Sequence, residues 1–199
     1  MSYSGRRLRA DPFTDLLFNI LLSFTLLMFL AIIFMNPIPK TGVINPKAEY
    51  IITVSWKDNN PDDVDTYVQS PTGDLIWFRG KEAGFVHLDR DDRGLLNDTI
   101  EINGEKVQNP LNQEVVTIRA VVPGEYIVNI HYYATETGEP VDVNVKVEKV
   151  NPQLEVIYYG TINLEKKGVE KTATRFNISQ GGKVTVSGNL YKKLVPENQ

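Results

Sequence analysis

The sequence predicts a single N-terminal transmembrane α-helix followed by an all-β sandwich domain. Two observations predict this fold class. Residues 11–36 contain a long, nearly unbroken apolar run, and from residue 49 onward apolar and polar side chains alternate with the two-residue period of β-strands. We therefore divide the chain into an N-terminal tail (1–10), the helix (11–36), a proline-rich linker (37–48) and the β-sandwich domain (49–199).

The apolar run has the length and the start signals of a transmembrane helix. From Leu16 to Met35 there are about twenty residues, which at about 1.5 Å per residue cover about 30 Å of hydrocarbon. Asp11 is suited to accept hydrogen bonds from the free N–H groups of the first turn, and Pro12 suits the first helical position because it lacks an N–H group.

One narrow polar stripe interrupts the apolar surface of this helix. Asp15, Asn19 and Ser23 follow one another at intervals of four residues, so they lie within an arc of about 80°. Because polar groups facing lipid lack partners, we expect the stripe to face another protein or a hydrated path. The alternative is that Asp15 lies at the headgroup level and complements the helix dipole.

The charges that flank the helix predict its orientation. Arg6, Arg7 and Arg9 precede it, and the next basic residue is Lys40, so the N-terminus is expected in the cytoplasm and the β-domain outside. A cleaved signal peptide is the competing interpretation. An aspartate near the start and the absence of a small-x-small cleavage pattern after the apolar run favour an uncleaved, single-pass anchor in the lipid bilayer.

Composition narrows the class of the β-domain. With 42% hydrophobic and 23% charged residues, the chain is typical of a folded protein, and its length outside the helix suits one domain. The net charge of −4 does not favour nucleic acid as a partner. The chain has no cysteine, which excludes disulfides, thiolate metal sites and a cysteine nucleophile.

Eleven runs rich in β-branched and aromatic residues predict the strands of the sandwich. Turn sequences such as S-P-T-G-D (70–74) and T-G-E-P (137–140) separate several of them. The last three runs either extend the same sandwich or pair with a second copy of the chain. The predicted strands are 49–56, 64–70, 74–79, 84–88, 98–102, 114–122, 125–134, 141–150, 154–164, 171–178 and 183–191.

The string P-F-T-D-L-L (12–17), with Asn19 and the apolar helix after it, resembles the transmembrane segment of the ExbD/TolR/MotB proteins. These are B subunits of ion-driven membrane motors. The resemblance implies that Asp15 carries a proton or sodium ion, with Asn19 and Ser23 along its path. It also implies a dimer of this chain inside about five copies of a multi-span MotA/ExbB/TolQ-like subunit, in a bacterial inner membrane with the C-terminal domain in the periplasm.

A second resemblance concerns the β-domain. The segments D-D-V-D-T-Y-V-Q-S-P-T-G-D (62–74), H-L-D-R-D-D-R-G (87–94) and V-V-P-G-E-Y-I-V (121–128) are similar to those of YfaP-like secreted bacterial β-sandwich domains. That group has a D-x-D-x-x-V…P-x-G opening and a P-G-x-Y-x-V closing strand. The resemblance implies a fold and a location outside the cytoplasm.

Acidic residues gather at two places in the β-domain. Asp62, Asp63 and Asp65 lie at the start of one predicted strand, and Asp89, Asp91 and Asp92 occupy the loop that ends at Gly94. Carboxylates at such spacing are suited to bind a hard cation, so Asp89, Asp91 and Asp92 form a candidate Ca²⁺ site. Arg93 stands where a further ligand is expected, and no glutamate closes the loop, so solvated loop charge is the alternative.

No catalytic motif accompanies these residues, and we do not expect an enzyme. His87 and His131 fall within predicted strands, without a nucleophile elbow, a phosphate loop or an H-E-x-x-H pattern. The motor resemblance implies a B subunit without a cofactor, whose coupling ion is H⁺ or Na⁺, and the acidic loop leaves Ca²⁺ as a possible further ion. The alternative is a membrane-anchored module without ion coupling, whose sandwich binds a glycan or a protein through aromatic residues such as Trp56, Trp77, Tyr132 and Tyr133.

Overall fold

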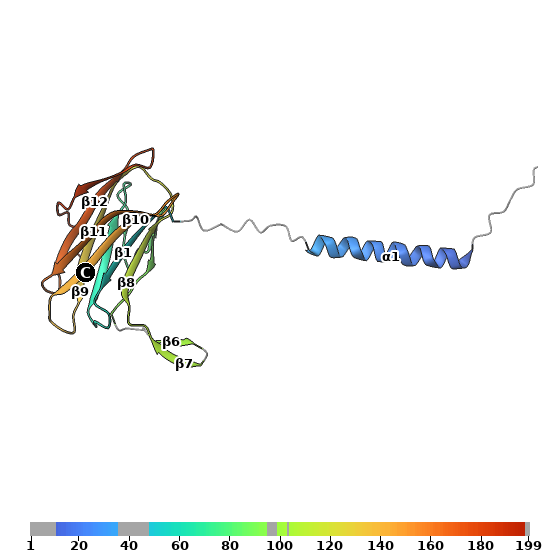
Figure 1. Cartoon of the computed structure of the whole chain (residues 1–199), viewed down its shortest axis with the longest axis horizontal. Coiled ribbons are helices and arrows are strands. Elements are labelled where there is room, and N and C mark those ends of the chain that lie inside the picture. The colour runs from blue at the N-terminus through green and yellow to red at the C-terminus, as the bar shows by residue number, and fades with distance from the viewer. Residues whose placement is uncertain (1–10, 36–47, 95–98, 103, 198–199) are drawn as a thin grey trace, which may run out of the picture. The chain divides into compact units, whose positions relative to one another are not determined.

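The computed structural model describes residues 11–35, 48–94, 99–102 and 104–197. The predicted N-terminal tail and all but the last residue of the predicted linker lie outside the described residues. The chain divides into two compact units, Met1–Asn45 and Pro46–Gln199, and Figure 1 labels the helix of the first and several strands of the second.

The first unit contains one helix, α1 (Pro12–Met35). Its start is built as the sequence predicts: Asp11 Oδ1 accepts a hydrogen bond from the Phe13 N–H group at 3.1 Å, and Asp11 Oδ2 accepts one from Thr14 Oγ1 at 3.0 Å. The segment Pro12–Ile32 has a mean hydropathy of 2.2, and none of it is buried against other parts of the chain. The helix is therefore long and apolar enough to cross a membrane, as an anchor or as a signal sequence.

The second unit is built from antiparallel strands, and the predicted β-domain is confirmed at that level. One sheet has six strands in the order β11 (Glu155–Leu164), β10 (Val141–Lys149), β1 (Tyr50–Trp56), β8 (Asn112–Ile118), β5 (Val86–Arg90) and β4 (Glu82–Ala83). Another has five strands in the order β13 (Val184–Gly188), β12 (Glu170–Ile178), β9 (Gly124–Ala134), β2 (Asp63–Gln69) and β3 (Leu75–Ile76). A separate hairpin pairs β6 (Thr99–Ile102) with β7 (Glu105–Gln108).

A single apolar cluster takes side chains from both of the larger sheets. Along β1, alternate residues from Tyr50 to Trp56 are buried, as the two-residue period predicts. The same cluster includes Val145 from β10 of that sheet and Ile130 and Phe176 from the five-stranded sheet. Each fully buried apolar side chain of this size stabilises the fold by about 1.5–3 kcal/mol before entropy is counted.

The C-terminal strands belong to these same sheets. Strand β11 pairs with β10, β12 pairs with β9, and β13 pairs with β12. Of the two alternatives for the last three predicted strands, extension of the chain's own sheets is therefore the one observed.

The predicted strand 74–79 is shorter than expected, and this shapes the site. It keeps the ladder only at Leu75 and Ile76 within the described structure. Trp77 and Gly80 then exchange two backbone hydrogen bonds, at 3.1 and 3.0 Å, which reverses the chain. The turn carries Phe78 and leads to Lys81. Both side chains lie beside Asp63 and Asp65, in the uncovered half of β2, which is the part that β3 does not pair with.

Candidate metal centre

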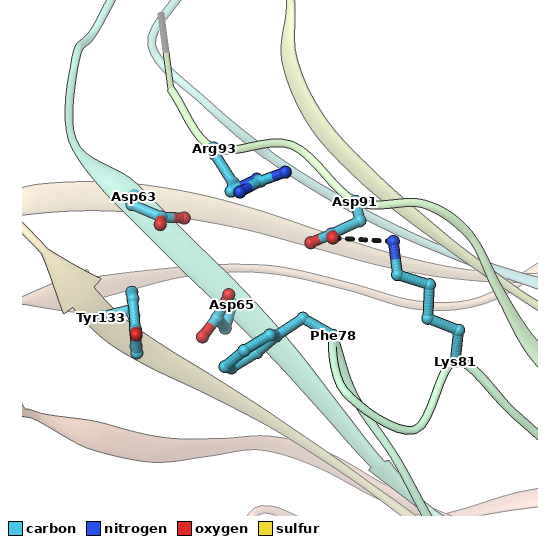
Figure 2. Close-up of a pocket in the computed structure, with 7 residues that line it drawn as sticks. All are labelled: Asp63, Asp65, Phe78, Lys81, Asp91, Arg93 and Tyr133. Atoms are coloured by element: carbon cyan, nitrogen blue, oxygen red, sulfur yellow. Dashed lines mark hydrogen bonds and ion pairs between the residues drawn. The ribbon is translucent and has the colours of Figure 1, made fainter. Parts of the chain in front are cut away.

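A pocket of about 290 Å³ opens beside β2 (Figure 2). Strand β2 contributes two carboxylates, the segment after β5 contributes a carboxylate and a guanidinium group, and β9 contributes an aromatic ring. The turn between β3 and β4 contributes a second ring and an ammonium group. The lining residues are Asp63, Asp65, Phe78, Lys81, Asp91, Arg93 and Tyr133.

Strand alternation places Asp63 and Asp65 in this pocket. Because Val64 packs into the apolar core, its two neighbours point to the opposite face of the five-stranded sheet. Both are nonetheless buried, with exposed fractions of 9% and 3%. Oδ1 of Asp63 and Oδ2 of Asp65 are buried oxygens without a hydrogen-bond partner in the described structure.

Glu114 approaches the same place from the other sheet. It occupies an inward-facing position of β8, and its exposed fraction is 1%. Its Oε2 accepts a hydrogen bond of 2.6 Å from the Thr66 N–H group, while its Oε1 has no partner among the described residues. This contact is available because β3 pairs with Val68 and Gln69, further along β2, and leaves Thr66 free of that ladder.

Three carboxylates converge beside β2. One oxygen from each of Asp65, Asp91 and Glu114 lies within 4.8 Å of the other two. The three residues come from β2, from the segment after β5 and from β8. Oxygen atoms of carboxylates are the ligands that hard cations such as Ca²⁺ and Mg²⁺ prefer, so the arrangement is suited to hold one.

Burial and mutual repulsion oppose ionisation of the group. Burial, followed by the charges of Asp63 and Asp91, raises the pKa of Asp65 to about 8. Burial and the charge of Asp91 raise the pKa of Asp63 to about 6, although Arg93 opposes the shift. Burial and the charge of Asp65 also raise the pKa of Glu114 well above its usual range. A divalent cation would remove both penalties at once.

Two basic side chains border the group in different ways. Lys81 Nζ lies 2.9 Å from Asp91 Oδ2, and the Lys81 side chain is 54% exposed. Arg93 lowers the pKa of Asp63 through its charge, but it makes no hydrogen bond or ion pair with any residue that the structure describes. Figure 2 shows its side chain projecting between Asp63 and Asp91.

Of the three residues predicted to bind Ca²⁺, Asp91 is in the converging group. Asp89 instead accepts hydrogen bonds from Arg119 Nη2 at 2.6 Å and Thr117 Oγ1 at 2.5 Å. Asp92 accepts from Arg90 Nη2 at 2.8 Å and from the Gln113 N–H group at 3.1 Å. Neighbouring residues of an extended segment point in different directions, so Asp89 and Asp92 have other partners than Asp91.

Asp62 precedes β2 and has a structural role. Its carboxylate accepts five hydrogen bonds of 2.5–3.0 Å, from the side chains of Tyr132, Thr135 and Thr137 and from the N–H groups of Glu136 and Thr137. Burial raises the pKa of Asp62, but these hydrogen bonds outweigh it and lower the pKa to about 2. Asp62 therefore stays ionised and fixes the loop after β9.

The predicted aromatic face is not formed. Trp56 and Tyr132 are buried in the core, with exposed fractions of 3% and 0%, and the Trp56 Nε1–H group donates to the Asp62 carbonyl oxygen at 3.0 Å. Trp77 stacks on Tyr67, with ring centroids 5.7 Å apart. Among the four predicted residues, Tyr133 alone lines the pocket.

The residues predicted for ion transport lie on α1. Asp15, Asn19 and Ser23 are exposed on the helix, and the Asp15 N–H group donates to the Asp11 carbonyl oxygen at 3.0 Å. These positions fit the alternative stated for Asp15, a carboxylate in the first turn that complements the helix dipole.

Comparison with known proteins gave no match to a protein family or to a curated protein. Among solved structures, the chain is similar to a protein of unknown function, with 13% sequence identity, a TM-score of 0.48 and coverage of 71% of this chain and 88% of that chain. It is also similar to a homologue of telluride resistance protein (TerD) from Streptomyces coelicolor A3(2), with 12% identity, a TM-score of 0.47 and coverage of 75% and 93%.

These comparisons correct the motor interpretation. One solved structure is a TerD homologue and the other has no known function, so neither supports a motor B subunit, and no family match supports the ExbD/TolR/MotB-like or the YfaP-like assignment. The physical reason is that the motor resemblance rested on one acidic residue in the first turn of a leucine-rich helix, and the helix dipole favours such a residue in helices of many kinds. Ion transport at Asp15 is therefore not retained. The predicted multi-span partner stays untested.

Proposed function

We propose that this protein is a membrane-anchored β-sandwich domain that binds Ca²⁺ through Asp65, Asp91 and Glu114. The observation that carries the proposal is the convergence of three carboxylate oxygens within 4.8 Å, contributed by three separate segments. Asp65 and Glu114 are almost completely buried, and each keeps one oxygen without a hydrogen bond from the described residues. Buried polar atoms are nearly always paired, so unpaired carboxylate oxygens that share a pocket fit a missing cation.

The chemistry of the site favours Ca²⁺. All of the converging ligands are oxygens, which excludes a preference for soft metals. Ca²⁺ accepts six to eight ligands in flexible geometry, whereas Mg²⁺ requires a near-ideal octahedron. Carboxylates from three separate segments match the more tolerant cation, Ca²⁺, with water completing its coordination shell.

In this proposal the helix anchors the chain in the membrane, and the β-domain that carries the cation site lies outside. Helix α1 spans the membrane once, with Arg6, Arg7 and Arg9 on the cytoplasmic side and the β-domain outside. The six-stranded and five-stranded sheets form the two layers of a sandwich around the apolar cluster that both supply. Extracellular modules bind Ca²⁺ with dissociation constants of about 10⁻⁴–10⁻³ M, which is the affinity expected here.

Calorimetric titration of the full chain in detergent tests the proposal. Wild-type protein should bind one Ca²⁺, and the Asp65→Asn and Glu114→Gln variants should lose at least tenfold in affinity because each lacks one charged ligand. At ten times the dissociation constant, bound Ca²⁺ should raise the free energy of unfolding by about 1.4 kcal/mol.

The matched control is Asp89→Asn, which removes a carboxylate from the neighbouring segment. Asp89 is bound by Arg119 and Thr117, so its loss should leave Ca²⁺ affinity within twofold of wild type. Equal Ca²⁺ affinity in wild type, Asp65→Asn and Glu114→Gln, or no binding at millimolar Ca²⁺, would overturn the proposed function.

A further inference from the structure

The proposed cation site is open toward the rest of its pocket. Asp65, Asp91 and Glu114 can supply only part of the six to eight oxygen ligands of Ca²⁺. The remaining positions face a pocket of about 290 Å³, close to the lower end of the roughly 300–1,000 Å³ typical of small-molecule sites. A ligand in this pocket would therefore reach the cation directly.

Arg93 lines this pocket and makes no hydrogen bond or ion pair with the described residues, although its charge acts on Asp63. Its guanidinium group projects between Asp63 and Asp91, whereas the other cation of the pocket, Lys81, is paired with Asp91 at 2.9 Å (Figure 2). The planar guanidinium fork binds two oxygens of a carboxylate or phosphate at once, which an ammonium group does not do. Arg93 is thus available to an oxyanion beside the cation.

Two aromatic rings form the apolar part of the pocket. Phe78 and Tyr133 lie with their centroids 5.4 Å apart and their planes at 61°, so they make a corner. The Tyr133 side chain belongs to the exposed aromatic residues of the domain. Such a corner accepts a flat apolar group by edge and face contact.

The charges of the pocket make this binding conditional on the cation. Ca²⁺ binds the deprotonated carboxylates, and in that form Asp63, Asp65, Asp91 and Glu114 carry two more charges than Lys81 and Arg93 together. One bound Ca²⁺ balances this excess. With Ca²⁺ bound, the pocket has no net negative charge, and the cation itself attracts an oxyanion.

We propose that the pocket binds a small ligand with an oxyanion, either a carboxylate or a phosphate, attached to an aromatic body. The oxyanion bridges the cation and the Arg93 guanidinium group, and the aromatic body packs on Phe78 and Tyr133. This inference rests on the proposed cation site and adds the class of ligand that the site takes.

The test uses the full chain in detergent, with benzoate, phenyl phosphate and methyl phosphate as probes and ligand-observed NMR as the readout. With saturating Ca²⁺, phenyl phosphate or benzoate should bind, and a chelator should abolish the binding. Comparison of the two probes shows whether the site prefers phosphate or carboxylate.

Two variants separate the contacts. Arg93→Gln should keep or improve Ca²⁺ affinity, because it removes a positive charge near the cation, yet it should weaken the bound oxyanion at least tenfold. Phe78→Leu should weaken phenyl phosphate more than methyl phosphate, since only the former carries a ring.

The outcomes distinguish this inference from the proposed function. If wild-type protein binds Ca²⁺ but none of the probes, the inference fails and the cation site stands. Probe binding that survives chelation, or that is unchanged in Arg93→Gln, also overturns it. If Ca²⁺ itself does not bind, both the proposed cation site and the inferred ligand class are wrong.

Discussion

Asp62 and Asp65 lie three residues apart and both are buried, yet their pKa values move in opposite directions. Five hydrogen bonds hold Asp62 in its charged form and lower its pKa to about 2. Asp65 has an oxygen without a partner among the described residues, so burial dominates and raises its pKa to about 8. A buried carboxylate with its partners is part of the framework, whereas one without them is available to a ligand.

The pH dependence of stability follows from the raised pKa values. In chelator, the folded state holds protons on Asp65 and Asp63 more tightly than the unfolded state does. These groups therefore favour folding most below about pH 4, and stability falls as pH rises through about 6 and then about 8. Urea unfolding of the full chain at pH 5 and pH 8 should show a loss on the order of a few kcal/mol.

Asp65→Asn is the variant that isolates this effect, because an amide does not titrate. Its stability should change less between pH 5 and pH 8 than that of wild type. Ca²⁺ should reverse the wild-type trend, since the cation binds the deprotonated carboxylates and its affinity rises with pH. A wild-type stability that stays constant across this range in chelator would contradict the assignment.

Loss of Asp62 should be the most damaging single change in the β2 segment. Asp62→Ala removes the acceptor of five hydrogen bonds, one of them buried and four part-buried, and a donor left unpaired away from water costs about 1–3 kcal/mol. We expect the free energy of unfolding to drop by at least about 3 kcal/mol in urea titrations. Asp58→Ala, at an exposed position four residues earlier, is the control and should change stability by less than about 0.5 kcal/mol.

At the level of elements, alternation predicted the long strands well, because one face of each packs into the core. The hydrophobic period located β1, β9 and β10 to within one residue. It overestimated β3, where the Trp77–Gly80 turn ends the ladder after two residues, and β7 was not predicted. Short strands have too few residues to show a two-residue period, so the geometry of the adjacent turns determines where they begin and end.

The candidate site was predicted only in part, for a physical reason. Asp91 was selected from a local acidic spacing, and Asp63 and Asp65 were noted as acidic residues at the start of a strand. Glu114 was missed because it looks like an ordinary polar residue of an alternating strand, and its inward position emerges only when β8 lies opposite the uncovered half of β2. Sites made from three separate segments depend on tertiary pairing, which spacing in the sequence does not contain.

Gly94 positions the segment that carries Asp91 and Arg93. It has a φ of +65°, and a Cβ atom there would lie 2.5 Å from the Pro61 carbonyl oxygen. Gly94→Ala therefore adds a clash to the backbone strain and should push this segment away from β2. We expect a stability loss on the order of 3 kcal/mol, with a Ca²⁺ affinity at least tenfold lower in calorimetry.

Gly84→Ala is the matched control for this change. Gly84 has a similar φ of +59°, but a Cβ atom there has nothing within 4 Å. Its replacement should cost only the backbone strain, about 1–2 kcal/mol, and leave Ca²⁺ affinity unchanged. Equal effects of the two substitutions on affinity would show that the contact between Gly94 and Pro61 does not position the site.

For the whole molecule, the sequence of the helix predicted its structure but not a function, and the β-domain revealed its candidate site only once folded. The helix is specified by its apolar run and its Asp11 cap, and these same features are shared by many unrelated anchors, so they did not identify a function. The function proposed here comes instead from the β-domain, where burial of unpaired carboxylates depends on the packing of both sheets.

The orientation of the whole chain in the membrane can be measured with single introduced cysteines. Because the chain has no cysteine, a single introduced cysteine reports its own position without background. We expect Lys167→Cys, at an exposed site between β11 and β12, to react with a membrane-impermeant maleimide in intact bacterial spheroplasts that express the full chain. Ser4→Cys, before the helix, should react only after lysis, since three arginines beside a membrane helix favour the cytoplasmic side. Both proteins should run at the full-length mass in the membrane fraction. Labelling of Ser4→Cys before lysis would reverse the orientation, and a shortened, released product would identify α1 as a signal sequence rather than an anchor.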